Sequence, residues 1–314
     1  MASAISHDTR GFTRRHKKPK AGTSRQSLSG KRVAFGLATA MTMTGMSAGP
    51  SSANFPTPID ATWKLVFDEE FSGTSLRADR WTANWLGCPT CITPPVQPNN
   101  EKAAYDPANA KVANGRLHLS LVKNPVVVNG KRYAYRSGMV QSNDQARFTY
   151  GYFEARIYMP ISGATNKIAN WPAFWMNGQN WPIDGENDIA EALGGDACFH
   201  FHSPDGSPGG CAAGNFTGWH VYGALREPGS VTYYYDGREI GKITEGVTDS
   251  PMYLILNYAM SEIGGALRVP ATMQVDYVHV YSRDPYAVAV KPDPGYGGPG
   301  DDKINNTIQT ADAR

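Results

Sequence analysis

The feature that most constrains the fold is a long series of short strand-forming segments. At least ten of them, rich in Val, Ile, Tyr, Phe and Trp, follow one another between residues 63 and 282, and such residues favour strands. No long amphipathic helical pattern and no internal repeat interrupts the series. We therefore expect an all-β domain in which two large antiparallel sheets form one sandwich. Four dipeptides typical of tight turns divide the segments: Asn114-Gly115, Asn129-Gly130, Asp236-Gly237 and Gly264-Gly265.

Composition divides the chain into four parts. Residues 1–53 hold nine of the 30 basic residues but one of the 28 acidic ones, and they end in an apolar run and a small-residue cleavage pattern, as in a secretion signal with a long basic n-region. A disordered tail with a chance apolar run is the alternative. Residues 54–61 resemble a linker, 62–283 form the strand-rich domain, and 284–314 form a Pro/Gly-rich tail that we expect to be disordered.

The charge distribution and the cysteines both suit an exported protein. Outside its basic start the chain is acidic, so we expect no nucleic-acid partner, and we expect a secreted, extracellular monomer with no membrane contact once the signal is removed. Four cysteines form two local pairs, Cys88 with Cys91 and Cys198 with Cys211, which predicts two disulfides in that compartment. A CxxC redox site and a four-thiolate zinc site stay open as alternatives.

Three carboxylates within six residues mark the candidate site, in the segment "GENDIAE". Because strand side chains alternate between faces, Glu186 and Asp188 share a face, whereas Glu191 would point to the opposite one. A lone charge between two sheets is costly. One extra residue near Ile189-Ala190, a β-bulge, returns Glu191 to the face of the other two.

The neighbourhood of these acids indicates chemistry on sugars. Two carboxyl groups with different protonation states, one a nucleophile and one an acid, are what glycoside hydrolysis needs. In "NWPAFWMNGQNWP" the alternation places Trp171 and Trp175 on one face, and indole rings in a cleft stack on pyranose rings. In "CFHFHS" the two histidines share a face, and we select His202 as a cleft residue. A solvated acidic strand and a calcium site are the alternatives.

The order "WPAFW" then "GENDIAE" resembles the signature of the glycoside hydrolase family 16 β-glucanases, in the laminarinase-like branch with a bulged E-x-D-x-x-E motif. Segments such as "LVFDEEFSGTSLRADRW", "YGYFEARIYMP", "LILNYAM" and "MQVDYVHVYS" also look like family segments, so that the likeness covers most of residues 62–283. The resemblance implies a concanavalin-like β-jelly-roll sandwich with a concave substrate cleft, and retaining hydrolysis of β-glycans.

The resemblance also implies roles for individual residues. Glu186 would be the nucleophile, Glu191 the general acid/base, and Asp188 the acid that tunes them. It implies no catalytic cofactor but a structural calcium on the side away from the acids. The matching cleft positions are Trp171, Trp175, His202 and Asn257, and the matching calcium ligands are Glu70, Gly115 and Asp276.

Two residues depart from the family pattern. Asn187 stands where an aliphatic residue is usual, and it should face the sheet interface, where its amide needs partners. Met139 stands where the family often has a cleft arginine, which leaves the glucan specificity open. We expect an endo-acting β-1,3 or mixed β-1,3/1,4-glucanase. The alternatives are a hydrolase of another polysaccharide such as a galactan or a bacterial exopolysaccharide, a transglycosylase, and a non-catalytic lectin on the same fold.

Overall fold

The computed structural model describes residues 57–85, 88–163 and 165–283. The expected secretion signal, the first residues of the linker and the Pro/Gly-rich tail lie outside these residues, so their predictions remain untested. Within the described ranges no helix is long and apolar enough to cross a membrane. The helical element found there is a single 3-10 turn, η1 (Pro107–Asn109).

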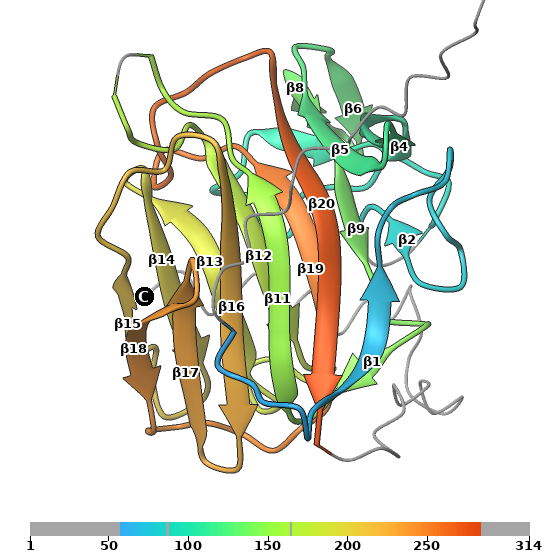
Figure 1. Ribbon diagram of the computed structural model, residues 1–314. Helices are drawn as coiled ribbons and strands as arrows, with labels where there is room; N and C mark the ends of the chain where they lie inside the picture. The colour runs from blue at the N-terminus through green and yellow to red at the C-terminus, as the bar shows by residue number, and fades with distance from the viewer. Residues whose placement is uncertain (1–56, 86–87, 164, 284–314) are drawn as a thin grey trace, which may run out of the picture. The chain divides into compact units, whose positions relative to one another are not determined.

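Two eight-stranded sheets make up the domain, and all strand pairs within them are antiparallel (Figure 1). In spatial order, the first sheet contains β18 (Arg238–Ile243), β17 (Ser230–Tyr235), β16 (Trp219–Glu227), β11 (Gly151–Tyr158), β20 (Ala271–Ser282), β5 (Arg116–Leu121) and β4 (Ala110–Ala113), with β1 (Lys64–Glu69) also paired to β20.

In the same way, the second sheet contains β15 (Gly209–Cys211), β14 (Asp196–His202), β13 (Glu186–Leu193), β12 (Trp171–Asn177), β19 (Met252–Ala259), β9 (Met139–Gln141) and β2 (Thr82–Ala83), with β10 (Arg147–Phe148) also paired to β19. Two small sheets join β3 (Ala103–Tyr105) to β8 (Tyr135–Ser137) in parallel, and β6 (Val126–Val128) to β7 (Lys131–Tyr133).

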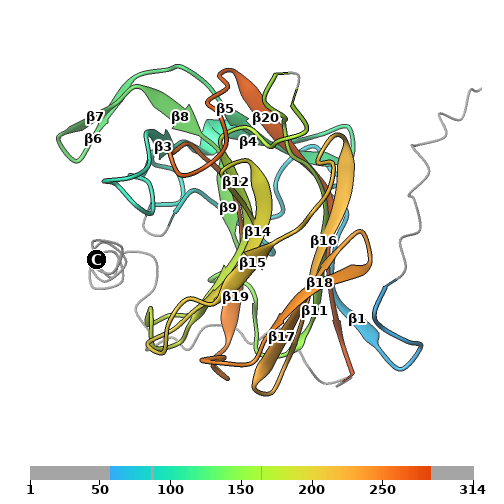
Figure 2. The ribbon, with the colours of Figure 1, turned by 90° about the vertical axis from the view of Figure 1, so that its left-hand side faces the viewer.

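The two large sheets face each other, as Figure 2 shows from the side. Their inner faces enclose the main core, to which alternate residues of each strand contribute: β12 gives Phe174 and Met176, and β14 gives Phe199 and Phe201. Because side chains alternate, each strand buries its apolar face against the other sheet and leaves its second face outside the core. The structure is the β-jelly-roll sandwich that the sequence predicted.

Turn chemistry sets the hairpins as expected. Asp236 and Gly237, between β17 and β18, have φ of 50° and 74°, and Asn114 and Gly115, between β4 and β5, have 54° and 68°. Positive φ at both central residues defines the type I′ turn that matches strand twist.

A smaller apolar cluster lies on the other face of the second sheet and includes Tyr105 of β3. Trp85 and Trp175 stack there with ring centroids 6.0 Å apart. Met139 is fully buried in the same cluster. The residue that replaces the expected cleft arginine therefore belongs to the buried cluster that contains the stacked tryptophans.

Candidate active site

The predicted bulge is present on β13. Glu191 pairs with Ala173 and Asp188 with Trp175 of β12, so that Ile189 is the extra residue. Pairing with β14 slips over the same interval. Ile189 and Ala190 are both buried in the core between the sheets. Because these two consecutive residues both point inward, Glu191 points to the cleft face, as Glu186 and Asp188 do.

All seven predicted catalytic and sugar-binding residues line one cleft over the second sheet. The cleft has a volume of about 430 Å³, which is within the usual range for small-molecule sites. Its lining includes the three carboxylates of β13, indole and imidazole rings from β12 and β14, and side chains of the loop before β3. The predicted residues in it are Trp171, Trp175, Glu186, Asp188, Glu191, His202 and Asn257.

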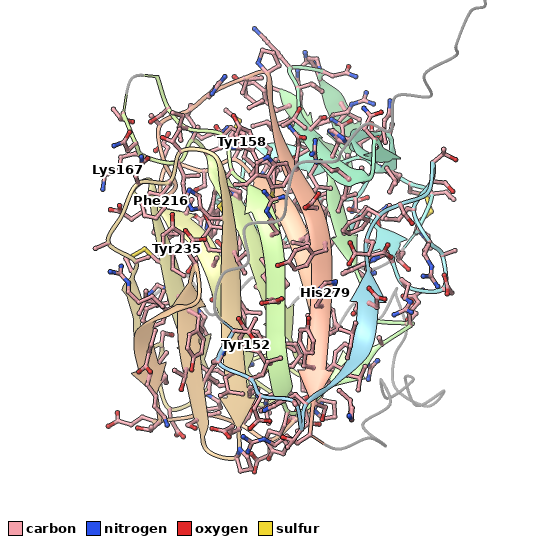
Figure 3. The ribbon with its side chains drawn as sticks, viewed as in Figure 1. Tyr152, Tyr158, Lys167, Phe216, Tyr235 and His279 are labelled. Atoms are coloured by element: carbon pink, nitrogen blue, oxygen red, sulfur yellow. A yellow bond between two sulfur atoms is a disulfide. The ribbon has the colours of Figure 1, made fainter. Side chains whose placement is uncertain are left out.

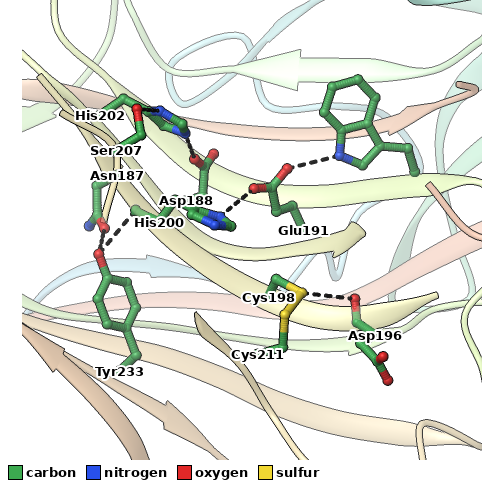
Figure 4. Close-up of polar contacts among 11 residues, drawn as sticks. Asn187, Asp188, Glu191, Asp196, Cys198, His200, His202, Ser207, Cys211 and Tyr233 are labelled. Atoms are coloured by element: carbon green, nitrogen blue, oxygen red, sulfur yellow. Dashed lines mark hydrogen bonds and ion pairs between the residues drawn. A yellow bond between two sulfur atoms is a disulfide. The ribbon is translucent and has the colours of Figure 1, made fainter. Parts of the chain in front are cut away.

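Both carboxylate oxygens of Glu191 have a nitrogen partner (Figure 4). Trp171 Nε1 donates to Oε2 at 2.9 Å, and His200 Nδ1 lies 2.8 Å from Oε1. A Cβ added at Gly209 of β15 would lie 2.0 Å from His200 Cδ2, so glycine leaves the imidazole its position beside Glu191. These contacts fix the orientation of a carboxyl group whose side chain is buried at the cleft floor.

Asp188 lies at the centre of the acidic group and is paired with the second imidazole. His202 Nε2 is 3.0 Å from Asp188 Oδ2, and the other ring nitrogen, Nδ1, is 2.7 Å from Ser207 Oγ. A hydroxyl can donate or accept, so Ser207 holds the ring of His202 in either tautomer.

A chain of buried hydrogen bonds connects the cleft tryptophan to an acid that the motif does not contain. Trp175 Nε1 donates to Asn257 Oδ1 at 2.8 Å, Asn257 Nδ2 donates to Tyr105 Oη at 2.9 Å, and Tyr105 Oη donates to Glu101 Oε2 at 2.7 Å. Burial raises the pKa of Glu101 to about 7. The chain joins β12 and β19 to β3 and fixes the indole of Trp175 in the cleft wall.

Sequence reasoning missed three of these residues. Glu101 and Tyr105 both lie within the segment "NNEKAAY", which carries no acid pair or alternation that marks a site. His200 was placed on the same face as His202, and that alternation was the signal for it. The selection of one histidine was too narrow, because both line the cleft.

The structure explains Asn187. Its side chain is fully buried between the sheets, where Tyr233 Oη of β17 donates to Asn187 Oδ1 at 2.7 Å (Figure 4). The same hydroxyl lies 3.1 Å from the backbone carbonyl oxygen of His200. One tyrosine of the first sheet thus binds both site-bearing strands, β13 and β14.

Both predicted disulfides are present, Cys88–Cys91 and Cys198–Cys211. Cys198 lies on β14, opposite Glu191 of β13, and Cys211 lies opposite Cys198 on β15. The second disulfide therefore links the edge strand β15 to β14 at the position next to Glu191. As disulfides, the four sulfur atoms do not provide the thiolate ligands of a zinc site.

The expected calcium ligands do not form a fitting donor set. Asp276 binds two guanidinium groups, with Arg156 Nη1 at 2.6 Å and Arg116 Nε at 3.5 Å. Glu70 Oε1 instead contacts His279 Nε2 at 2.6 Å. Two arginines on one carboxylate are unfavourable neighbours for a dication, so a calcium ion bound by Glu70, Gly115 and Asp276 would have to displace them.

Comparison with known proteins finds similarity to a beta-glucan-associated family and to several glycan-cleaving enzymes. A model of the family described as beta-glucan synthesis-associated protein SKN1/KRE6/Sbg1 matches residues 46–181 and so ends before the acidic motif. Glucan endo-1,3-beta-glucosidase A1 of Niallia circulans is 28% identical over 71% of this chain. Endo-1,3-1,4-beta-glycanase ExsH of Rhizobium meliloti is 32% identical over 70%. The chain spans 38% and 52% of the length of these two relatives.

Solved structures of glucanases resemble this chain over about 70% of its length. The endo-beta-1,3-glucanase from Pyrococcus furiosus has a TM-score of 0.60 at 28% identity, with 70% of this chain and 94% of that chain covered. SCLam, a non-specific endo-beta-1,3(4)-glucanase from family GH16, has a TM-score of 0.61 at 27% identity, with 73% and 94% covered.

Proposed function

Because the chain belongs to glycoside hydrolase family 16, we propose that it is an endo-acting β-glucanase that cleaves β-1,3 or mixed β-1,3/1,4 linkages with retention of configuration. The observation that carries the proposal is the bulged β13, which brings Glu186, Asp188 and Glu191 to one cleft. The names of both curated relatives agree with this linkage class.

Glu186 is the proposed nucleophile and Glu191 the proposed acid/base. Glu186 attacks the anomeric carbon while Glu191 gives its proton to the departing glycosidic oxygen, and a glycosyl-enzyme ester forms on Glu186. Glu191 then takes a proton from water, which attacks the same carbon and releases Glu186. Trp171 and His200 hold the Glu191 carboxyl at the glycosidic oxygen in both steps.

Asp188 has a separate role in this scheme. It lies between the two glutamates in sequence and is buried among them. Its carboxylate lines the cleft together with both glutamates, and we assign it the role of tuning the electrostatic environment in which they act. His202 and Ser207 keep the Asp188 carboxylate in place.

A panel of polysaccharides tests the substrate class. Purified protein is incubated with laminarin, mixed-linkage β-glucan, cellulose, β-1,4-galactan and keratan sulfate, and new reducing ends are measured. We expect release from the first two, and none from Glu186→Ala. Cleavage of galactan or keratan sulfate alone would replace the glucan proposal. Galactan and keratan sulfate are included because a keratan-sulfate endo-1,4-beta-galactosidase of Sphingobacterium multivorum is 27% identical over 73% of this chain.

Azide tests the division of roles. With an activated aryl β-glucoside, Glu191→Ala still forms the glycosyl-enzyme, and azide takes the place of water to give the β-glycosyl azide. With Glu186→Ala, azide attacks the free glycoside directly and gives the α-azide. Swapped products would reverse the two assignments, and sugar release by Glu186→Ala at the parent rate would refute the mechanism.

Export completes the proposal. Two disulfides within the described residues support an oxidising compartment, and we propose that residues 1–53 direct the chain there and are removed. N-terminal sequencing of protein recovered from culture medium should begin after Ala53. Size-exclusion chromatography with light scattering should give the mass of one chain, as proposed for a monomer.

A further inference from the structure

The cleft contains a second kind of donor set besides the acids. One atom each from Asp188, Glu191, His200 and His202 lies within 4.8 Å of the other three. Two of these contacts are already short, with 2.8 Å from His200 Nδ1 to Glu191 Oε1 and 3.0 Å from His202 Nε2 to Asp188 Oδ2. Two imidazoles and two carboxylates converge on one point of the cleft (Figure 4).

We propose that these four residues form an inhibitory site for a divalent transition-metal ion such as Zn²⁺. Zinc binds imidazole nitrogen and carboxylate oxygen at about 2.0–2.2 Å in a tetrahedron, so its ligand atoms lie about 3.3–3.6 Å apart. The two short pairs, at 2.8 and 3.0 Å, would therefore open by about 0.3–0.8 Å, and the remaining pairs, which are at most 4.8 Å apart, would close by up to about 1.5 Å. Calcium and magnesium prefer six or more oxygen ligands and suit this set poorly.

The groups around the four donors support metal binding. Ser207 Oγ contacts His202 Nδ1, the nitrogen that does not face Asp188. A metal-binding imidazole commonly donates its second N–H to such an oxygen, which fixes the tautomer and the ring orientation. Gly209 leaves room for the ring of His200, whose Nδ1 faces Glu191. A metal ion would replace the protons between each histidine and its carboxylate, and the contact of Ser207 with His202 Nδ1 would remain.

Occupation of this site would stop the proposed reaction. An ion bound to Glu191 takes the carboxylate lone pair that must carry the catalytic proton, and it occupies the space between the acids in the cleft. The metal would therefore act as a reversible inhibitor. The inhibition rests on the proposed function, whereas binding of the ion does not.

A second cluster must be removed before metal binding is measured. Asp68, Glu70 and His279 also offer ligand atoms within 4.8 Å of one another, and His279 lies on β20 beside β1 (Figure 3), in the first sheet. His279→Gln eliminates that set and leaves the cleft unchanged. All titrations are therefore made in the His279→Gln background of the full chain.

Chelator-treated protein is titrated with ZnCl₂ by calorimetry in a non-coordinating buffer at pH 7, and glucan hydrolysis is followed in parallel. We expect one ion per chain, and inhibition that EDTA reverses. His200→Gln and His202→Gln should each weaken binding at least tenfold, and Ser207→Ala about tenfold or more, as for other outer partners of metal-binding histidines. His220→Gln, a histidine outside the cleft, is the matched control and should bind as the parent does.

Three results would overturn the inference. They are no binding up to millimolar Zn²⁺, equal binding by His200→Gln and the parent, and an equal loss in His220→Gln. Binding that follows the cleft histidines in a protein that hydrolyses nothing on the polysaccharide panel would refute the proposed function and leave the metal site standing.

Discussion

Removing the hydroxyl of Tyr233 tests how the two sheets hold the acidic strand. In the native protein this hydroxyl is the donor to Asn187 Oδ1 and also faces the carbonyl oxygen of His200. Burial raises the pKa of Tyr233 well above its ordinary value, so the group remains a donor at any working pH. The amide nitrogen of Asn187 has a weaker partner, Met176 Sδ at 3.9 Å.

The loss in free energy of unfolding depends on which buried group each variant leaves without a hydrogen-bond partner. Tyr233→Phe leaves a fully buried amide oxygen without its donor, which costs about 1–3 kcal/mol of the free energy of unfolding. At about 3 °C per kcal/mol for a domain of this size, Tm should fall by about 3–9 °C. Asn187→Leu is milder, because it removes a buried polar group of similar shape while Tyr233 keeps the carbonyl of His200. The double variant should be more stable than the sum of the two single changes predicts.

Urea unfolding and thermal melts of the four proteins measure this cycle. Tyr234→Phe is the matched control, because within the described chain its hydroxyl makes no hydrogen bond to the protein and the chemical change is the same; its Tm should stay within about 1 °C of the parent, a shift of at most about 0.5 kcal/mol. A larger loss of stability in Asn187→Leu than in Tyr233→Phe would refute the reasoning. So would strict additivity in the double variant, since the two side chains would then not be coupled.

Further predictions follow from the cleft and its surroundings. Because burial raises the pKa of Glu101 from 4.5 to about 7, the native state binds this proton more tightly than the unfolded chain, and stability should fall by about 3 kcal/mol as pH rises through that window; Glu101→Gln should abolish this slope in Tm against pH. Replacing Cys198 and Cys211 by Ala should cost about 3 kcal/mol in the chain-entropy model, measured by urea unfolding, and non-reducing peptide mapping that finds both thiols free would contradict the pairing. Trp171→Phe removes a donor to the Glu191 carboxyl and should lower kcat/KM for laminarin about ten- to hundredfold, the equivalent of a hydrogen bond to a charged group. Adding EGTA should leave Tm unchanged, because arginines occupy the expected calcium ligand; a fall of several degrees would show a bound ion that stabilises the fold.

The fold and the placement of the acidic motif could be predicted from the sequence because both rest on local patterns. Alternation in β12 and β14 assigns each side chain to a face, and the odd spacing between Asp188 and Glu191 requires a bulge if all three acids are to avoid the core. The Asn-Gly and Asp-Gly turns have the positive φ values that their residues favour. None of these inferences needs knowledge of distant contacts.

What could not be read depends on partners far away in the chain. Asn187 is satisfied by a tyrosine 46 positions later, and Glu101 enters the site through a chain of bonds that reaches Asn257, 152 positions after Tyr105. Periodicity gives the face on which a residue lies but not the residue that meets it there. The arginines that bind Asp276 are another such contact, and they are the reason that the calcium prediction has no fitting ligand set.

The bulge also explains why the chemistry of this site depends on packing between the sheets. Along β13 the acids that line the cleft alternate with the residues that enter the core, Asn187, Ile189 and Ala190. Any shift of β13 toward or away from the first sheet therefore moves Glu186 and Glu191 with it, and retaining chemistry tolerates a carboxyl separation of only about 5–5.5 Å. The hydrogen bond from Tyr233 fixes β13 at the residue between Glu186 and Asp188, and its contact with the carbonyl of His200 fixes the imidazole strand by the same group. An aliphatic residue at position 187 would fill the interface but could not set this depth, so the polar choice adds positional control to a core that is otherwise apolar.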